Sequence, residues 1–329
     1  MILFLILLGV IGISFFQSHQ KQTQRAAIPA SSSTSESQTG TFVDNLYGRF
    51  VYYKDGKFYE VRLPSRISVQ LAGIDSKLVD TFPGVRPAWS PDGSKFAFVV
   101  SNSSVGIVTY ATGVRVSLLE PDPKLDLSKQ IDISFSPDGL FLLVKQQEQE
   151  EGRSHIRFYT VATGKLATEE SGCDYHGVWI QRSSLYATIC QIEGQKNIVL
   201  IDPANIDKPI SSVGQPDTYI LLNAFDSSSL LVKKGELPGK LSLTGHFTPL
   251  DQKQFTGIVS LDAFIDLPKA LARKIETDMK TEKIDDIVVS PNNTFAVFHT
   301  PKGLWIIGLP LKDNPYFLFS GTLPSIQPL

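Results

Sequence analysis

The fold of this chain is decided by the stretch Ala88-Trp89-Ser90-Pro91-Asp92-Gly93-Ser94-Lys95-Phe96-Ala97-Phe98-Val99-Val100. Pro91 presets the backbone φ for the second position of a turn, and Asp92 and Gly93 tolerate the left-handed conformations that close a turn. The residues that follow the turn are aromatic and β-branched, which is typical of a half-buried strand. The stretch therefore predicts a strand, a tight turn and a second strand.

The same pattern recurs along the chain. A second copy covers residues 132–144, a weaker copy covers residues 287–298, and two degenerate copies begin at Gly177 and Leu222. Measured from the serine that enters the first turn, the positions lie 46, 44, 45 and finally 65 residues apart, and the last interval contains an insertion. Most copies are followed by two more strand-like runs, and four strands in about 40 to 45 residues is the period of a β-propeller blade.

An opening unit precedes these copies. Residues 49–53 and 58–63 flank Asp55-Gly56, which is a strong hairpin signal, and residues 66–71 follow as a third strand. Residues 41–44 are expected to form the innermost strand. The sequence thus predicts an all-β fold, a β-propeller of about six four-stranded blades over residues 41–322, whose closed ring removes exposed sheet edges. Seven blades, or a last blade completed by a strand from the other terminus, are also compatible with the pattern.

Two of the turns carry a family resemblance. Trp89-Ser90-Pro91-Asp92-Gly93 and Phe135-Ser136-Pro137-Asp138-Gly139 resemble the WD40-like (PD40) repeats of TolB-like β-propellers, and Ser290-Pro291-Asn292-Asn293 is a partial match. The resemblance implies a six-bladed propeller, often in the bacterial envelope, that works by binding other proteins. Similar repeats form the propeller of prolyl-oligopeptidase-type enzymes. The Gly-x-Ser-x-Gly elbow of their hydrolase domain is absent from this sequence, so that activity is not expected.

Composition narrows the class of partner. The 329 residues are 42% hydrophobic, which is ample for a sizeable core. Lys and Arg number 31 against 33 Asp and Glu, and without a basic excess the chain is not expected to bind nucleic acid. The sequence contains no phosphate loop, HExxH or EF-hand pattern, so no cofactor and no metal is predicted. We expect a monomer with protein partners.

The chain has two cysteines, Cys173 and Cys190. Their spacing matches neither a zinc site nor a disulfide-dense scaffold. They flank a predicted hairpin near facing positions, and both a single disulfide and two unpaired thiols are compatible with the sequence.

The N-terminal region differs from the rest of the chain. Residues 1–16 are apolar, and as a helix they span about 24 Å, somewhat less than a bilayer core of about 30 Å. The basic region and the small-x-small cleavage site of a signal peptide are absent. We interpret residues 1–16 as an uncleaved membrane anchor, with a signal segment as the alternative. Residues 17–40, rich in Gln, Ser and Thr, are interpreted as a flexible linker.

The orientation in the membrane is predicted from two opposing signals. Lys21 and Arg25 follow the apolar segment, and by the positive-inside rule they favour a cytoplasmic position for the rest of the chain. The succession of anchor, linker and propeller is common outside the membrane. We predict that the propeller is extracytoplasmic.

A candidate site follows from the alignment of the blades. The residue four before the turn-entry position is Arg86, Asp132, His176 or Asp286 in four blades, and equivalent positions at the starts of innermost strands meet at one mouth of the channel. Converging polar groups there predict a site for a ligand or partner. The alternatives are solvated rim charges and a metal site built from the two aspartates and the histidine.

No catalytic residue is predicted. The turn residues are assigned a structural role because turn geometry already requires them: Pro91, Asp92, Gly93, Pro137, Asp138 and Gly139. The favoured function is a membrane-tethered binding or scaffolding module of the bacterial cell envelope. The alternative is a propeller enzyme, such as a lyase, lactonase or glycan hydrolase, that uses the ring at the channel mouth.

Residues 266–280 are predicted to form the one clear helix. Asp266 is placed to cap its N-terminus, and the helix carries a narrow apolar stripe of Leu267, Leu271, Ile275 and Met279. The stripe is expected to pack on the propeller itself, with partner docking as the alternative. Residues 323–329 are assigned to a tail.

Overall fold

A computed structural model describes residues 44, 46–71, 74, 85–100, 104–109, 115–119, 125–126, 128–148, 152–205, 207, 210–214, 219–250, 267–279, 282–290, 295–309, 311 and 315–326. The chain divides into two compact units, residues 1–39 and 40–329, and all described residues belong to the second. The predicted anchor at residues 1–16 and linker at 17–40 lie outside the described residues. None of the helices formed by the described residues has the length and apolar character needed to cross a bilayer.

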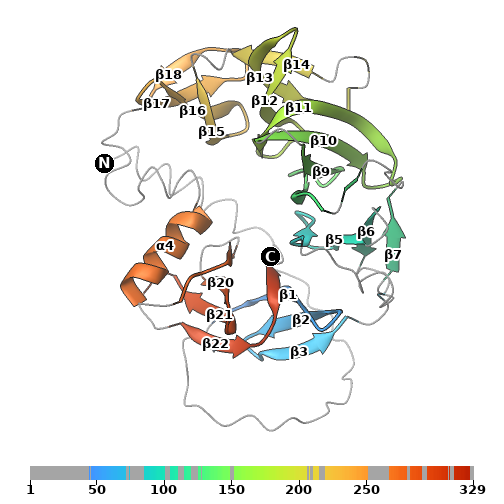
Figure 1. The fold of residues 1–329 in the computed structure, drawn as a ribbon, viewed down its shortest axis with the longest axis vertical. Coiled ribbons are helices and arrows are strands. Elements are labelled where there is room, and N and C mark those ends of the chain that lie inside the picture. Colours follow the sequence, from blue (N-terminus) through green and yellow to red (C-terminus); the bar gives the residue numbers. More distant parts are fainter. Residues whose placement is uncertain are drawn as a thin grey trace, which may run out of the picture. The chain divides into compact units, whose positions relative to one another are not determined.

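The described residues form antiparallel sheets of up-and-down strands (Figure 1). The first sheet contains β1 (Gly48–Lys54), β2 (Lys57–Leu63) and β3 (Ile67–Gln70). Lys54 faces Lys57 across the two-residue turn of Asp55 and Gly56, both with positive φ. The predicted Asp-Gly hairpin is confirmed, because a two-residue turn of this kind requires left-handed backbone at both positions.

The innermost strand of the first sheet comes from the other end of the chain. β23 (Thr322–Ile326) pairs antiparallel with β1, with Phe50 facing Ile326. The edge of β1 that residues 41–44 were expected to cover is therefore occupied by β23, and residues 323–326 belong to a strand rather than a tail. The pairing satisfies backbone groups that would otherwise form an exposed edge.

Three further sheets of the described residues follow the predicted four-strand period. One contains β4 (Ala88–Trp89), β5 (Lys95–Val100), β6 (Ser104–Thr109) and β7 (Arg115–Leu118). Another contains β15 (Ile220–Ala224), β16 (Ser229–Lys234), β17 (Leu237–Ser242) and β18 (Phe247–Pro249). The last contains β19 (Asp286–Val289), β20 (Phe295–Thr300), β21 (Gly303–Gly308) and β22 (Tyr316–Phe319).

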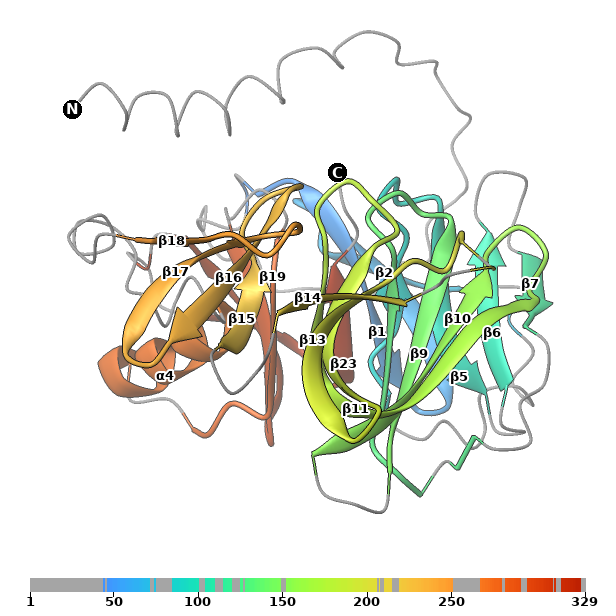
Figure 2. The same cartoon turned by 90° about the horizontal axis from the view of Figure 1, so that it is seen from above.

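Two predicted blades are joined in one seven-stranded sheet. Its strands are β8 (Ile131–Phe135), β9 (Phe141–Gln147), β10 (Arg153–Thr160), β11 (Leu166–Trp179), β12 (Tyr186–Ile192), β13 (Gln195–Ile201) and β14 (Ile210–Gly214). The long strand β11 is the outermost strand of one blade where it pairs with β10 and the innermost strand of the next where it pairs with β12 (Figure 2). The described residues thus contain the six predicted blades in five sheets. The described residues do not show a closed ring, and closure stays a prediction.

The serine that enters each motif turn locks the turn through its hydroxyl. In the first copy the Ser90 hydroxyl accepts the Lys95 N–H at 2.9 Å and donates to the Asp92 carboxylate at 2.6 Å. Asp92 in turn accepts the Ser94 N–H at 3.0 Å, and Gly93 takes the positive φ. The aspartate therefore contributes through its carboxylate, and only the glycine needs left-handed backbone.

Apolar side chains fill the space between neighbouring sheets. On β5, Phe96 and Phe98 pack against Phe58 of the first sheet, whereas Ala97 and Val99 pack toward the seven-stranded sheet. Since successive side chains of a strand point to opposite faces, a strand buried on both sides reads as a continuous apolar run. This explains the apolar runs that follow each turn.

The predicted helix is present as α4 (Leu267–Met279). Leu271 and Ile275 are buried and share a core cluster with Ile287 and Phe298 of the last sheet. The middle of the predicted stripe therefore packs on the protein's own blade, as expected. Asp266, the predicted cap, lies outside the described residues.

Candidate functional site

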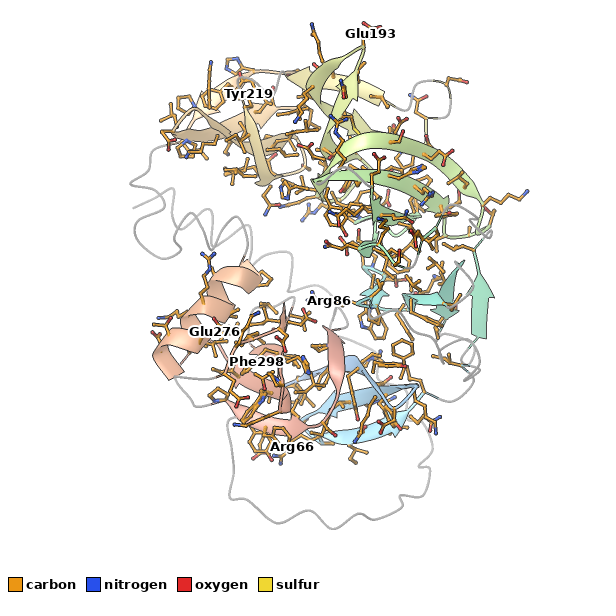
Figure 3. All side chains as sticks on the ribbon, in the orientation of Figure 1. Arg66, Arg86, Glu193, Tyr219, Glu276 and Phe298 are labelled. Atoms are coloured by element: carbon orange, nitrogen blue, oxygen red, sulfur yellow. A yellow bond between two sulfur atoms is a disulfide. The ribbon has the colours of Figure 1, made fainter. Side chains whose placement is uncertain are left out.

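The structure joins two of the four predicted channel-mouth residues directly. Arg86 precedes β4 and Asp286 begins β19, and their side chains form an ion pair in which the Arg86 Nε lies 3.2 Å from Asp286 Oδ2. In Figure 3, Arg86 lies between the sheet that contains β4 and the sheet that contains β19. The pair connects residues 200 positions apart in the sequence.

Asp132 lies close enough to this pair to influence it. Burial lowers the pKa of Arg86 from its ordinary value, and the Asp132 carboxylate acts in the opposite direction. Asp132 also forms an ion pair with Lys145 of β9, whose Nζ lies 3.2 Å from Asp132 Oδ2. The Lys145 ammonium in turn lies 4.4 Å from the centre of the Tyr175 ring, a cation–π distance. Three of the four predicted residues are therefore electrostatically linked.

His176 makes a different contact. It is exposed, and its Nε2 lies 3.1 Å from the carbonyl oxygen of Leu222. Among the residues that the structure describes, no group of three or more His, Cys, Asp or Glu side chains is arranged to hold a metal ion. The structure thus does not bring His176 and the two aspartates together as ligands.

His176 belongs to a bulge in β11. Cys173 faces Cys190 of β12, but Gly177 faces Thr188, so the three residues 174–176 of β11 stand opposite the single residue Ile189. Bulges of this kind redirect side chains and are frequent beside functional sites. The sequence contains no strong signal for this bulge, since only Gly172 and Gly177 within an otherwise strand-like run suggest an irregularity.

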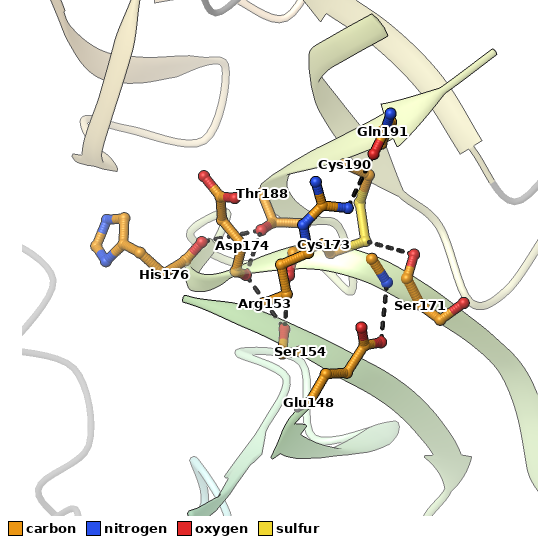
Figure 4. Close-up of a disulfide and its surroundings, with 11 residues drawn as sticks. Glu148, Arg153, Ser154, Ser171, Cys173, Asp174, His176, Thr188, Cys190 and Gln191 are labelled. Atoms are coloured by element: carbon orange, nitrogen blue, oxygen red, sulfur yellow. Dashed lines mark hydrogen bonds between the residues drawn. A yellow bond between two sulfur atoms is a disulfide. The ribbon is translucent and has the colours of Figure 1, made fainter. Parts of the chain in front are cut away.

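Neighbouring strands hold the bulge in place (Figure 4). The Thr188 hydroxyl lies 2.9 Å from the His176 carbonyl oxygen and 3.2 Å from that of Asp174. On the other side, the Ser154 hydroxyl of β10 lies 3.2 Å from the carbonyl oxygens of both Cys173 and Asp174. Carbonyls that the bulge removes from the regular ladder are therefore satisfied by hydroxyl groups.

A disulfide joins Cys173 and Cys190 at one end of the bulge, with the two Cα atoms 4.0 Å apart. Both cysteines are buried. Of the two alternatives that the sequence allowed, the structure selects the disulfide. The disulfide fixes the pairing of β11 with β12 at the residue directly before the bulge.

Gly177 closes the other end of the bulge. A Cβ atom at this position would lie 2.3 Å from Tyr186 Oη, which is far inside van der Waals contact. Tyr186 is only 1% exposed, and its hydroxyl has no hydrogen-bond partner among the described residues. Burial raises the pKa of Tyr186, and the charges of Asp132 and Tyr175 act in the same direction. The close approach of this ring requires glycine at position 177.

A cavity of about 690 Å³ opens over the β11 bulge. Its lining brings together three basic residues on three strands, one carboxylate, an aromatic ring and the predicted histidine: Lys145, Gly152, Arg153, Asp174, Tyr175, His176, Gly177 and Lys196. The volume falls within the range of ligand-binding pockets. Of these residues the sequence predicted only His176, because the basic residues come from strands β9, β10 and β13, whose alignment depends on sheet register.

The solved structures that are similar to this chain include a TolB protein and two peptidases. TolB from Acinetobacter baumannii is 17% identical, with a TM-score of 0.41, over 86% of this chain and 67% of that chain. Prolyl oligopeptidase B from Galerina marginata is 13% identical, with a TM-score of 0.44, over 86% of this chain and 40% of that chain. Dipeptidyl peptidase 4 from Porphyromonas gingivalis is 11% identical, with a TM-score of 0.44, over 80% of this chain and 43% of that chain.

No family model matches the chain, and no curated protein matches it by sequence. The chain spans less than half the length of the two peptidases. The blade architecture therefore rests on the topology of the sheets, and the function on the site.

Proposed function

We propose that this protein is a membrane-tethered propeller that binds a protein partner on the extracytoplasmic side of a bacterial cell envelope. The observation that carries the proposal is the cavity over the β11 bulge, which a disulfide, Thr188 and Ser154 hold in shape. A preformed polar cavity reduces the entropy lost on binding, which favours recognition.

The Cys173–Cys190 disulfide also supports the location. Disulfides persist in oxidising compartments and are rare in the cytosol of mesophiles. An extracytoplasmic propeller, tethered through residues 1–16 and spaced from the membrane by residues 17–40, agrees with this chemistry.

The charges near the predicted channel mouth favour binding over catalysis. Arg86 pairs with Asp286, and Asp132 pairs with Lys145, so these side chains neutralise one another. A general acid or base needs access to a reacting group, and in these ion pairs each carboxylate is already engaged by a basic side chain. We therefore place the enzyme alternative second.

Site-specific photo-crosslinking in cells of the source organism tests the proposed partner binding. A photo-reactive phenylalanine analogue at His176, on the cavity wall, is expected to capture a discrete protein after illumination. The control position is Glu236, which is 95% exposed in the β16–β17 turn and does not line the cavity. The same product from both positions, or none from position 176 in the folded protein, would contradict partner binding at this cavity.

Protease accessibility tests the location. Protease added to spheroplasts should digest the propeller while a cytoplasmic marker protein stays intact. Thiol alkylation before reduction should leave Cys173 and Cys190 unmodified, since both sulfurs are in the disulfide. A protected propeller with two free thiols would place it in the cytoplasm.

A further inference from the structure

We infer that the disulfide between Cys173 and Cys190 selects the register of β11 against β12. In the oxidised chain it holds the bulged pairing that forms the cavity, whereas the dithiol form takes a regular pairing without the bulge. The inference rests on the proposed binding role of this cavity and adds how the cavity is controlled. Residues 174–177 all line the cavity, and they directly follow the disulfide on β11.

The two strands have a second possible register. Residues 177–179 pair with β12 in regular antiparallel order. Continued without a bulge, this order would place Tyr175 opposite Cys190 and Cys173 opposite Ile192. The disulfide instead holds Cys173 opposite Cys190, two residues along β12 from the regular position. The bulge is the part of β11 that this displaced pairing leaves over.

Both registers suit the apolar pattern of the strands. Side chains alternate between the two faces of a strand, so a shift of two residues returns each side chain to the same face. Cys173, Cys190 and Tyr186 share one buried cluster in the disulfide form, and the regular register keeps all three on that face. Burial of apolar side chains therefore does not choose between the registers, and the disulfide does.

Single hydroxyl groups support the bulge beside the disulfide. The Thr188 hydroxyl lies 2.9 Å from the His176 carbonyl oxygen, and the Ser154 hydroxyl lies 3.2 Å from that of Asp174 (Figure 4). In the regular register the backbone of residues 174–176 would pair with β12, and these ladder hydrogen bonds would offset the loss of the hydroxyl contacts. Reduction thus removes the covalent link that excludes the regular register.

The regular register would also change the opposite wall of the cavity. The hairpin of β12 and β13 carries Gln191, which accepts a hydrogen bond from Arg153, and Lys196, which faces Gln191 and lines the cavity. A shift of two residues moves this hairpin along β11 by about 7 Å. Residues 174–176 would at the same time enter the ladder, so the dithiol form lacks the wall that the bulge provides.

Burial of both cysteines places their oxidation before the sheet closes, since thiol–disulfide exchange needs direct approach to a sulfur atom. One cysteine thiolate attacks a disulfide of the oxidant, and the second releases the oxidant from the mixed disulfide. The two cysteine thiols lose two electrons and two protons, and the oxidant leaves as a dithiol. A thiol–disulfide oxidoreductase of an oxidising compartment supplies this step. The folded chain then keeps its register.

A cysteine introduced at position 175 tests the second register. The full-length Tyr175→Cys variant is refolded from urea into detergent micelles with glutathione disulfide, and tandem mass spectrometry maps its disulfides. We expect Cys190 to bond to position 175 in a detectable fraction of chains, because the regular register places them opposite. The matched control is Asp174→Cys, whose side chain belongs to the other face, so Cys190 should bond to Cys173 alone. Bonding to Cys173 alone in both variants, or equal bonding at 174 and 175, would overturn the inference.

Amide hydrogen exchange compares the disulfide and dithiol forms of the wild type, without any substitution. We expect residues 174–176 to exchange roughly tenfold more slowly in the dithiol form, because the regular ladder engages their amides. Simple loss of a cross-link predicts faster exchange instead. Residues 136–141, in the turn between β8 and β9, serve as the internal control and should exchange equally in both forms. Equal or faster exchange at 174–176, or a dithiol form that does not fold, would overturn the inference.

Crosslinking at position 176 separates this inference from the proposed function. The Cys173→Ser/Cys190→Ser variant should give roughly tenfold less product than the wild type, because its cavity is not preformed. Ser136→Ala, which lacks a buried hydroxyl in another turn but keeps the disulfide, should give the wild-type product. Equal product in the double variant would overturn the inference and leave partner binding in place. If the wild type gives no product, the protein-partner proposal fails, and the exchange experiment still decides the register.

Discussion

The turn between β8 and β9 and the turn between β11 and β12 occupy equivalent places in neighbouring blades, but different interactions hold them. At the first, the buried Ser136 hydroxyl accepts the Phe141 N–H at 3.0 Å and donates to Asp138 at 2.6 Å. At the second, Ile180 takes the place of the serine, and the equivalent bonds are made by the backbone: Ile180 N–H donates to Leu185 O at 2.8 Å and Ser183 N–H donates to Ile180 O at 3.3 Å.

The difference shows that a blade can keep its turn without the motif. The backbone hydrogen bond that joins the two strands next to the turn is common to both turns. In the motif turn, Ser136 N–H donates to Phe141 O at 2.9 Å, as Ile180 N–H donates to Leu185 O in the other. The side-chain lock is an addition to this bond. The blade without the lock instead has the Cys173–Cys190 disulfide, and it carries the β11 bulge and the cavity. Departures from a regular local pattern are expected where a site is built.

Among the substitutions that test this comparison, removal of the disulfide should lower the unfolding free energy most. The Cys173→Ser/Cys190→Ser double variant is expected to lose roughly 3 kcal/mol of unfolding free energy, because a cross-link between residues 17 positions apart limits the unfolded chain. Urea unfolding with and without reductant measures the loss. Reductant should destabilise the wild type by a similar amount and leave the double variant unchanged. Equal stability of the wild type and the double variant would contradict the disulfide's role.

Removal of the serine hydroxyl that locks the motif turn should cause the next largest loss of unfolding free energy. Ser136→Ala leaves the buried Phe141 N–H without its hydroxyl partner, which is expected to cost about 2 kcal/mol. Ser183→Ala, in the turn without the motif, removes a hydroxyl that donates to Ile180 O from a partly exposed position, and should cost less than about 1 kcal/mol. Urea unfolding of both variants tests the difference, and equal costs would mean that the motif adds no special stability.

The Asp92 carboxylate should make the lock of the first motif turn sensitive to acid. Partial burial acts to raise its pKa, but hydrogen bonds from Ser90 and Ser94 and the charge of Lys95 outweigh burial and bring the pKa down to about 2. Because the folded-state pKa lies below the ordinary aspartate pKa of 3.8, the unfolded state binds more protons between these two pH values. The stabilisation is therefore complete above pH 3.8 and lost as the pH falls toward 2.

The variant Asp92→Asn tests this dependence. We expect it to be less stable than the wild type by roughly 1 kcal/mol at neutral pH, and the gap to narrow on acidification as Asp92 is protonated. Urea midpoints of both proteins between neutral pH and the lowest pH at which both fold give the result. A gap that stays constant would show that the carboxylate charge does not contribute.

The smallest change in stability is expected for Tyr186, whose ring lies beneath the β11 bulge. Tyr186→Phe removes a buried hydroxyl that finds no hydrogen-bond partner in the described part of the chain, so the change should be neutral or slightly stabilising. Gly177→Ala, on the opposite side of the same contact, should be destabilising because its Cβ would meet that hydroxyl. Thermal unfolding compares the two, and a marked loss in Tyr186→Phe would reveal a partner for the hydroxyl.

The sequence by itself determined the local features of this protein. Ser-Pro-Asp-Gly turns, the Asp-Gly hairpin and the run of α4 depend on backbone preferences of a few adjacent residues, and they occur where the sequence predicts them. The blade period also follows from the sequence, because the pattern repeats and each copy needs a neighbour to bury its apolar face.

The tertiary structure alone decided which distant segments meet. The pairing of β23 with β1, the use of β11 by two blades and the contact of Arg86 with Asp286 all join parts that no local preference links. The β11 bulge has the same origin, since a register is set by both strands and their neighbours together. The basic cavity depends on that register, which is why the sequence pointed to His176 but not to Lys145, Arg153 and Lys196.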